Sequence, residues 1–560
     1  MGYIKQILNK NRGFVIFYIA LGIFNSFLAN YKAAYFQRVV DGLAERNILL
    51  GSILVYGAVL ILNFCSNYLE EYPAKKLENG IFLDFKLLAL DKISKIDYLA
   101  YQKIGTGKLV QQIENGACAG RNVLYKFWFC LIRQLIPTII FSIYFIWNIN
   151  RKITYVLLAG YGIVFVITNI LLKSLYQLKA KILNNEEQLN HFLVRGFMEM
   201  LVFRMEKQFP SEIRKANGAK QSIVSAKVKM NMIHEAFFTV FALLVAMLDI
   251  GILVYAWKSQ SISIGSVVAL ISLIDNAYTP IAVFNVLYVQ YKLDKSAFLR
   301  FEGFLNLPND EQLHSGQVVF HLHGDIQIEK LEFYYQERKI FDGLNLSIQK
   351  GEKVAFVGES GSGKSTLVKI IAGLLKYNAG NIYLDGKELK GLSLDSLYSQ
   401  IIYLSQDTPV FDGTIRENLV FDKTVSDEKL YQVLEKVQLL PLIERLQDGL
   451  DTKIGERGTS ISGGEKQRLA LARLWIRQAG IVILDEATSA MDNLTEEHVM
   501  HELIDALEHC TVIVIAHRLN ALADFDRIIV FRQGEIAGQG TFQELLEQNE
   551  YFRELYLAHE

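Results

Sequence analysis

The chain has 560 residues, too many for one ordinary domain and suited to two large ones. Hydrophobic residues make up 51% of it, charged residues only 21%, and the mean hydropathy is +0.21, which favours a membrane-embedded portion. The formal net charge of −1 offers no electrostatic basis for binding nucleic acid, so we expect no such partner. Four scattered cysteines without C-x-x-C spacing predict neither a disulfide framework nor a zinc site.

The first half of the chain, residues 1–305, is predicted to be an all-α transmembrane domain. A helix that crosses a bilayer needs about 20 mostly apolar residues. Six stretches approach this requirement, and they cover approximately residues 14–36, 51–71, 127–148, 153–173, 236–257 and 264–291. These stretches are apolar on all sides rather than along one stripe, which disfavours six buried helices of a soluble core.

Lysine and arginine gather in the two long connections, after the second and the fourth predicted span. Examples are Lys75-Lys76 and Arg214-Lys215, whereas the other connections are short and hold few basic residues. The positive-inside rule therefore places the long connections, both termini and the second half of the chain in the cytosol. We expect a multi-pass protein of the bacterial cytoplasmic membrane. Mixed charges and recurring apolar positions in the connections predict helices that continue well below the bilayer.

Four ionisable residues lie within the predicted spans: Lys32, Arg133, Asp249 and Asp275. Such residues are rare and energetically costly in a bilayer, so each is a candidate for a ligand pathway. Pairing inside the protein is the alternative for all four, and Lys32 and Arg133 could also extend towards an interface. Their mixed signs predict no particular charge for a ligand.

The character of the sequence changes after residue 305. Residues 306–323 are polar at the start and are predicted to be a linker. From residue 324 to residue 560, short β-like runs alternate with helical patterns, which predicts an α/β domain around a mainly parallel sheet. The predicted strands include residues 326–328, 354–357, 401–404, 481–484, 511–515 and 527–531.

A glycine-rich segment connects the predicted strand 354–357 to a helical pattern. Its sequence, G-E-S-G-S-G-K-S-T from Gly358 to Thr366, has the form and the context of a phosphate-binding P-loop. Glycines let backbone N–H groups curl around phosphates, and the following helix adds its positive N-terminal end. The predicted nucleotide-binding residues are Gly358, Ser360, Gly361, Ser362, Gly363, Lys364, Ser365 and Thr366. Lys364 would reach the outer phosphates, and Ser365 would ligate Mg²⁺.

The apolar run 481–484 ends directly in Asp485-Glu486. Carboxylates at the carboxyl end of a parallel strand point into the ligand crevice of such sheets. One of them can help to hold Mg²⁺, and the next can polarise an attacking water molecule. Alone, this pattern usually marks a strand that leaves the core. A P-loop in the same domain makes the functional interpretation much stronger.

The segment Ser462–Arg468, S-G-G-E-K-Q-R, resembles the signature sequence of ATP-binding cassette (ABC) transporters. Further segments match the family's order along the chain: Tyr335, the P-loop, Gln406, the signature, Asp485-Glu486, the D-loop Ser489–Asp492 and His517. Gly455–Gly458 is similar to the X-loop of exporter-type members, and Gly105–Leu109 to their cytosolic hairpins. The resemblance implies a half-transporter: a six-span all-α membrane domain fused to an α/β P-loop ATPase.

The resemblance also implies a role for each matched residue. Tyr335 would stack on adenine, and Ser365, Gln406 and Asp485 would organise Mg²⁺. Glu486 would be the general base, with His517 and Gln406 assisting. Ser462, Gly463 and Gly464 would face the P-loop of a partner chain, which implies a homodimer or a heterodimer with ATP between the subunits. The signature departs from the usual pattern at Glu465, where the family more often has glutamine.

We therefore predict an ATP-driven membrane transporter that exports a small amphipathic or peptide-like substrate by alternating access. Three alternatives remain open. The same fold can work as an importer, for example of metal–siderophore complexes. An ATP-gated channel or regulator would be expected to have an impaired site, whereas Glu486 is intact. A membrane-tethered ATPase would not need six spans.

Overall fold

The computed structural model describes residues 2–559 apart from 105, 260–261, 336, 407–409, 422–423, 456–460 and 517–521. Within it the chain forms two compact units. The first comprises Met1–Ser94 and Ile104–Leu307, and the second comprises Lys95–Lys103 and Pro308–Glu560.

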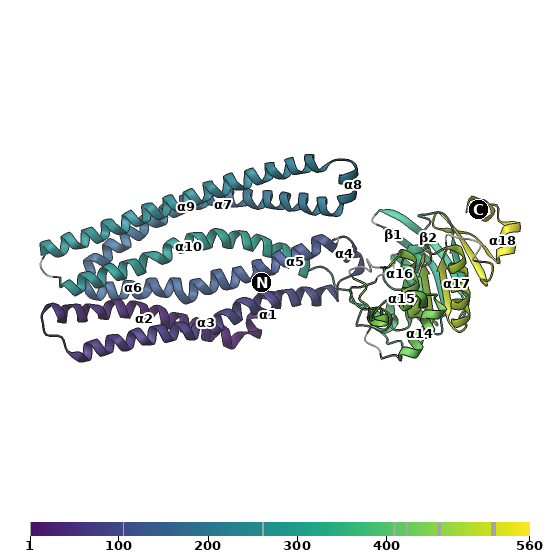
Figure 1. The fold of residues 1–560 in the computed structure, drawn as a ribbon, viewed down its shortest axis with the longest axis horizontal. Helices are drawn as coiled ribbons and strands as arrows, with labels where there is room; N and C mark the ends of the chain where they lie inside the picture. The colour runs from purple at the N-terminus through teal and green to yellow at the C-terminus, as the bar shows by residue number, and fades with distance from the viewer. Residues whose placement is uncertain are drawn as a thin grey trace. The chain divides into compact units, whose positions relative to one another are not determined.

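The first unit is helical wherever the structure describes regular elements (Figure 1). Its helices are α1 (Gly2–Lys10), α2 (Arg12–Ala44), α3 (Leu50–Ile93), α5 (Thr106–Arg121), α6 (Ile136–Ile149), α7 (Arg151–Met198), α8 (Met200–Met205), α9 (Phe209–Ser259) and α10 (Ile264–Leu305). Two π-helical segments, η1 (Asn122–Phe129) and η2 (Leu131–Leu135), connect α5 to α6.

Five long helical stretches are apolar enough to cross a membrane: Arg12–Ala44, Leu50–Ile93, Leu109–Ile149, Phe209–Lys258 and Ile264–Leu305. Five of the six predicted spans fall within them. The predicted span 153–173 falls in α7, where several side chains are outside the described residues, so this span stays a prediction. The all-α membrane domain expected from the sequence is confirmed.

The helices continue far beyond bilayer thickness, as the charge pattern of the connections predicts. Helix α3 has 44 residues and is therefore about 66 Å long, roughly twice the hydrocarbon thickness of a bilayer. Helices α7 and α9 lie side by side as a long hairpin with α8 at its tip (Figure 1).

Tyrosines join α7 to α10 in the interior of this unit. The hydroxyl of Tyr278 in α10 donates to the carbonyl of Leu157, 3.3 Å away, and that of Tyr161 in α7 donates to the carbonyl of Ala277, 3.0 Å away. Each buried phenol thus satisfies its polar tip with a backbone acceptor on the other helix. The pair fixes how the two helices pack.

The second unit is built on two sheets. The larger has the strand order β10-β9-β3-β8-β7-β6, and all its neighbouring strands are parallel except the pair β10 and β9. Its strands are β3 (Lys353–Val357), β6 (Ile401–Leu404), β7 (Ile481–Asp485), β8 (Thr511–Ile515), β9 (Arg527–Arg532) and β10 (Glu535–Gly540). The predicted mainly parallel sheet is confirmed.

The smaller sheet is antiparallel, with the order β2-β1-β4-β5. It contains β1 (Ile326–Tyr335), β2 (Arg338–Ile348), β4 (Ala379–Leu384) and β5 (Lys387–Glu388). Only the first residues of β1 were anticipated from the sequence.

Helices cover the larger sheet on both faces, since successive residues of β3 enter different cores. Val354 and Phe356 belong to one hydrophobic cluster, and Ala355 and Val357 belong to the other. The helices of this unit are α4 (Tyr98–Gln102), α11 (Lys364–Ile371), α12 (Leu394–Tyr398), α13 (Ile415–Val420), α14 (Asp427–Lys436), α15 (Leu440–Arg445), α16 (Gly463–Ala472), α17 (Asn493–Ala506), α18 (Phe542–Gln548) and α19 (Glu550–His559). A sheet buried on both faces leaves its strand ends as the place for a ligand.

The short helix α4 comes from the long connection after the second predicted span, yet it packs in the second unit. Tyr98 and Leu99 lie against the hydrophobic cluster that contains Phe356. The ammonium of Lys376 lies 2.8 Å from a carboxylate oxygen of Asp310 and 3.8 Å from one of Asp97. No sequence motif predicts this placement.

Candidate nucleotide-binding site

The P-loop leaves β3 and enters α11 at Lys364. Gly358 and Gly363 have φ angles of 143° and 107°, which side-chain-bearing residues rarely adopt. A Cβ on Gly358 would lie 2.1 Å from the carbonyl oxygen of Phe531, and one on Gly363 would lie 2.8 Å from the ring of Phe341. Both positions therefore require glycine.

Lys364 is held inside this loop and is only 5% exposed. Its ammonium donates to the carbonyl oxygens of Gly358 at 2.7 Å and Glu359 at 2.9 Å. Burial lowers the pKa of Lys364, and the nearby carboxylates of Glu486 and Asp485 oppose that shift. A phosphate group would offer this ammonium a charged acceptor, which forms stronger hydrogen bonds than a carbonyl does.

Asp485 ends β7, and both of its carboxylate oxygens accept hydrogen bonds. The Ser365 hydroxyl donates to Oδ1 at 2.8 Å, and the Tyr403 hydroxyl donates to Oδ2 at 2.9 Å. Burial, followed by the charge of Asp485, raises the pKa of Tyr403, so this phenol stays protonated. The structure thus brings Ser365 to Asp485, and it adds Tyr403, which sequence reasoning missed.

Gln406 and Glu486 meet at the same edge of the sheet. The side-chain amide of Gln406 donates to Oε2 of Glu486 at 2.6 Å. Glu486 has a φ of 55°, an energetically unfavourable conformation for a residue with a side chain, and such outliers concentrate at functional sites. His517, the third residue predicted to act here, and residues 456–458 of the predicted X-loop lie outside the described residues.

The residues at this edge fit Mg²⁺. Ser365 supplies a hydroxyl, Asp485 a carboxylate and Gln406 an amide oxygen, which are the hard oxygen ligands that Mg²⁺ prefers. In the part of the chain that the structure describes, no group of three or more His, Cys, Asp or Glu residues is arranged to hold a metal by itself. Mg²⁺ is usually bound by one or two carboxylates together with the phosphates of a substrate, and this site matches that pattern.

Tyr335 ends β1, in the hairpin that β1 forms with β2. Ile340 and Phe341 of β2 lie against Gly363, which places this hairpin beside the P-loop. The Tyr335 ring packs edge-on against Phe333, with the ring centres 5.0 Å apart. Its location beside the P-loop is compatible with the predicted stacking on adenine.

The predicted signature begins helix α16, and Ser462 is its N-cap. The Ser462 hydroxyl accepts from the Glu465 N–H at 3.3 Å, and the Glu465 carboxylate accepts from the Ser462 N–H at 2.6 Å. This capping box gives the unusual Glu465 a structural role. Burial acts to raise the pKa of Glu465, but the hydrogen bonds from Ser462 outweigh it, and the net shift is downward.

Gly463 and Gly464 pack against Ala490 of the predicted D-loop rather than against the P-loop. The Gln467 side chain reinforces this packing, since it accepts from the Ala490 N–H at 2.8 Å and donates to the Ser489 hydroxyl at 3.2 Å. Among the described residues, no hydrogen bond joins the signature to the P-loop of the same chain. The structure therefore does not bring these two predicted parts of the site together.

In the membrane unit, Arg133 forms an ion pair with Glu70 of α3. The Asn25 side chain donates to Glu70, and the Arg133 guanidinium lies 4.6 Å from the ring centre of Tyr18. Arg133 is thus paired inside the bundle, one of the two alternatives open from the sequence. Sequence reasoning missed Glu70; the available signal is that this acid directly follows the apolar run 51–69. Arg133 also sits in η2, and π-helical segments often mark functional positions.

Comparison with known proteins shows which part of the chain resembles ABC transporters. Residues 341–489 match the family model described as ABC transporter. The uncharacterised ABC transporter ATP-binding protein YwjA of Bacillus subtilis is 38% identical over 301 residues, and this match spans about half of each chain, 53% of this one and 52% of the relative. An ATP-dependent lipid A-core flippase of Alcanivorax borkumensis is 27% identical over 544 residues, which cover 94% of this chain and 90% of the flippase.

A solved structure, that of a bacterial Atm1-family ABC exporter with ATP bound, has the same fold. It superposes with a TM-score of 0.81 at 23% identity and covers 99% of both chains. The family model identifies the ATPase half, and the flippase and the exporter structure extend the similarity through the membrane half. Residues 341–489 therefore match an ABC transporter domain, and nearly the whole chain resembles a half-transporter with the exporter fold.

Proposed function

We propose that this chain exports an amphipathic small molecule as a dimer of half-transporters that uses ATP and Mg²⁺. The observation that carries the proposal is the assembly of Ser365, Asp485, Gln406 and Glu486 at one sheet edge by two direct hydrogen bonds. These residues come from three separate segments, and their meeting supports the roles proposed for them. An impaired ATPase site, expected of a channel or regulator, is not supported by this arrangement.

Each side chain has a proposed task, which for His517 rests on the sequence alone. Lys364 and the loop N–H groups would bind the outer phosphates, and Tyr335 would stack on the adenine. Glu486, oriented by Gln406, would accept the proton of the attacking water, with His517 assisting. Ser365, Gln406 and Asp485 would hold Mg²⁺, which neutralises phosphate charge when it is bound.

Two chains are needed to complete the site. Ser462, Gly463 and Gly464 present a helix N-terminus that suits a phosphate group, but they face away from the P-loop of their own chain. A second copy or a related half-transporter would place its signature over this P-loop. The signature of this chain would in turn lie over the P-loop of the partner. ATP would then close the two ATPase domains, and hydrolysis would allow them to reopen.

Export fits the relatives better than import, since the solved structure with the same fold is that of an exporter by its title. The flippase's cargo, lipid A-core, is amphipathic, which supports an amphipathic cargo for this chain. Basic cytosolic connections support the bacterial cytoplasmic membrane as the location, with both termini and the ATPase domain in the cytosol.

Reconstitution in liposomes tests direction and coupling together. ATP added outside energises only those molecules whose ATPase domains face outward, so an exporter will accumulate a fluorescent amphiphile in the inner leaflet or lumen. Glu486→Gln is the matched inactive control. Movement out of preloaded liposomes would instead identify an importer, and equilibration without accumulation would identify a channel.

A further inference from the structure

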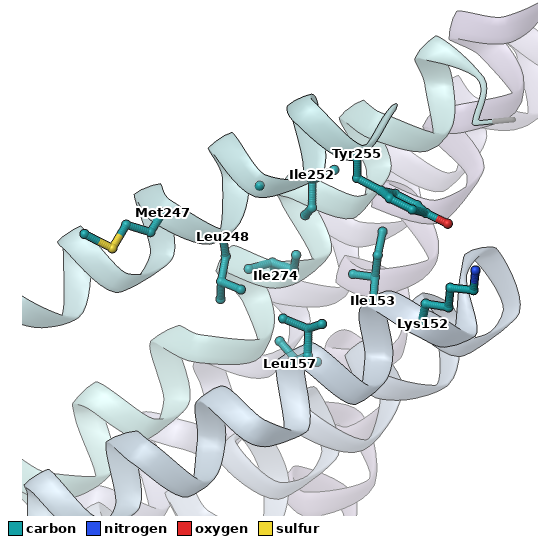
Figure 2. Close-up of a pocket in the computed structure, with 10 residues that line it drawn as sticks. Lys152, Ile153, Leu157, Met247, Leu248, Ile252, Tyr255 and Ile274 are labelled. Carbon is teal, nitrogen blue, oxygen red and sulfur yellow. The ribbon is translucent and has the colours of Figure 1, made fainter. Parts of the chain in front are cut away.

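The membrane unit contains a cavity that the ATP chemistry does not use. It lies between α7, α9 and α10 and has a volume of about 440 Å³, within the usual range of small-molecule sites (Figure 2). Leu157, Ile252 and Ile274 form buried parts of its wall. No Asp or Glu lines it among the described residues; Asp249 and Asp275 follow the lining residues Leu248 and Ile274 but do not themselves line the cavity.

The cavity has one polar end. Lys152 and Tyr255 lie at this polar end (Figure 2). Apolar side chains, among them Leu157, Leu248 and Ile274, line the rest of the cavity. In that view the Lys152 ammonium and the Tyr255 hydroxyl lie on the same side, away from Met247 and Leu248. The cavity is therefore amphipathic itself, with an apolar body and a mouth that carries one positive charge and one hydroxyl.

The mouth is positive for a second reason. Lys152 is the second residue of α7, directly after Arg151, and the first turn of this helix contains no acidic residue. The N-terminus of a helix carries a partial positive charge that adds to the charges of the two side chains. The mouth also lies at the ends of the predicted spans 153–173 and 236–257 that face away from the cytosol. At such an interface, Lys and Tyr side chains keep their polar tips in contact with water and headgroups.

We propose that this cavity binds the apolar chain of an anionic amphiphile and that Lys152 and Tyr255 hold its phosphate or carboxylate group. The inference rests on the proposed export of an amphipathic molecule and names its class: one apolar chain with an anionic head. Charge complementarity selects the anion, because a cationic head would be repelled by Lys152 and by the helix end. The occupant is the transported cargo, bound at the exit side of the membrane.

Gly251 provides a way to fill the cavity without disturbing the fold. It lines the cavity, and a Cβ placed on it meets no atom within 4 Å. Gly251→Leu therefore adds an apolar side chain at the cavity wall, and its Cβ meets no clash. Gly57→Leu in α3 is the matched control, since that position is equally open and lies elsewhere. For the mouth, Lys152→Gln is paired with Lys258→Gln, which lies near the end of α9 and does not line the cavity.

The test uses the full-length protein and two probes of equal chain length, dodecyl phosphate and dodecyltrimethylammonium. Binding is measured by native mass spectrometry without nucleotide, and ATP-dependent transport is measured in liposomes. We expect the phosphate to bind about tenfold more tightly than the ammonium, the effect of a charge-assisted hydrogen bond. Gly251→Leu should weaken the binding of both probes about tenfold. Lys152→Gln should weaken only the binding of dodecyl phosphate. Transport of dodecyl phosphate should fall in parallel, and both control variants should behave like the wild type.

Each other result contradicts a defined part of the inference. If the wild type transports dodecyl phosphate and both cavity variants transport it equally well, the cavity is not the cargo site, although the proposed function stands. If the wild type transports neither probe, the proposed function itself fails. Lost binding with unchanged transport would identify a resident bilayer lipid. A change in the dimer signal of Gly251→Leu, without a change in binding, would show that a second copy covers the cavity.

Discussion

The two halves of this molecule bring polar side chains together by different physical routes. In the ATPase unit, Gln406 follows β6, Asp485 ends β7 and Lys364 follows the loop after β3. Parallel strands of one sheet carry their carboxyl ends at the same edge, so residues that follow such strands are expected to gather there. In the membrane unit, Glu70 and Arg133 lie on different helical segments. They meet only because these segments pack against each other.

The routes also differ in what the surroundings demand. The ATPase edge must admit nucleotide and water, so its charges can meet phosphate or solvent even though Lys364 and Asp485 are largely buried in this structure. An ion within a membrane-spanning bundle has no such access, and it needs a partner of opposite charge. The loss of a charge should therefore abolish chemistry in one half and destabilise packing in the other.

The largest effect is expected from Glu486→Gln at the sheet edge. Removal of a general base should lower ATP turnover about 10²–10⁴-fold, while nucleotide still binds, because Lys364 and the loop remain. Single-turnover ATPase rates and equilibrium binding of a fluorescent ATP analogue measure the two effects. Glu502→Gln, which removes a surface ion pair with Lys436, is the control and should leave turnover unchanged. Turnover at the wild-type rate in Glu486→Gln would exclude this residue as the base.

Arg133→Met tests the membrane half. It leaves the buried Glu70 carboxylate without its partner, which costs about 3–5 kcal/mol in comparable cases, whereas replacing both members of a buried pair is often nearly neutral. We therefore expect a large drop in the melting temperature of the membrane unit for Arg133→Met and recovery in the double variant with Glu70→Met. Tryptophan fluorescence during heating in nanodiscs measures this melting temperature. Arg12→Met at the exposed start of α2 is the control. Equal melting of the single and double variants would show that the pair is not a coupled unit.

The same contrast explains what could be predicted from the sequence. The P-loop, Asp485 and Glu486 were predictable because each is a local pattern next to a predicted strand, whereas Gln406 was predictable only from the family resemblance. The smaller sheet was mostly missed because β1 contains register shifts after Ile328 and a positive φ at Lys330, and these irregularities interrupt the alternation that identifies a strand.

Two functional contacts required three-dimensional information. Tyr403 reaches Asp485 only because β6 pairs with β7 in a register that places Tyr403 opposite Ile483. Neither strand's own sequence encodes that register. Glu70 needed the packing of α3 against α2 and η2. The signature and the P-loop remain apart for another reason: in the function proposed above, they meet only between two chains.

Tyr403→Phe tests whether a residue outside the sequence motifs helps to position Asp485. It removes one of the two donors to Asp485, so this carboxylate should be held less firmly. We expect about a three- to tenfold rise in the Mg²⁺ concentration needed to support nucleotide binding, the effect of one lost hydrogen bond to a charged group. Because the pKa of Tyr403 is raised, its hydroxyl remains a donor in neutral and mildly alkaline solution. The effect should therefore be the same at pH 6 and pH 9.

Binding of a fluorescent ATP analogue at varied Mg²⁺ measures this prediction independently of turnover. Tyr431→Phe, on the exposed side of α14, is the control. A defect confined to turnover, with an unchanged Mg²⁺ requirement, would place Tyr403 outside the network that positions Asp485.

The smallest effect is expected at Glu465, where the ATPase half carries a charge at a helix end. Hydrogen bonds from Ser462 keep the pKa of Glu465 below its usual value, so the carboxylate is charged throughout the neutral range. Its contribution to stability is complete above the ordinary glutamate pKa and is lost as the pH falls through the lowered folded-state value. Glu465→Gln should thus cost little stability at neutral pH, since glutamine can also complete a capping box.

The same substitution removes a negative charge beside the predicted position of the partner's ATP. Charge–dipole effects at a helix N-terminus amount to about 0.3–1 kcal/mol, so ATP should promote dimer closure about two- to fivefold more strongly in Glu465→Gln. The ATP concentration dependence of an interchain crosslink or energy-transfer signal measures this. Glu544→Gln is the matched control, because Glu544 completes the same kind of capping box with Thr541 at the start of α18. If both variants shift the ATP dependence equally, the effect belongs to helix capping in general; a shift confined to Glu465 assigns it to charge at the nucleotide interface.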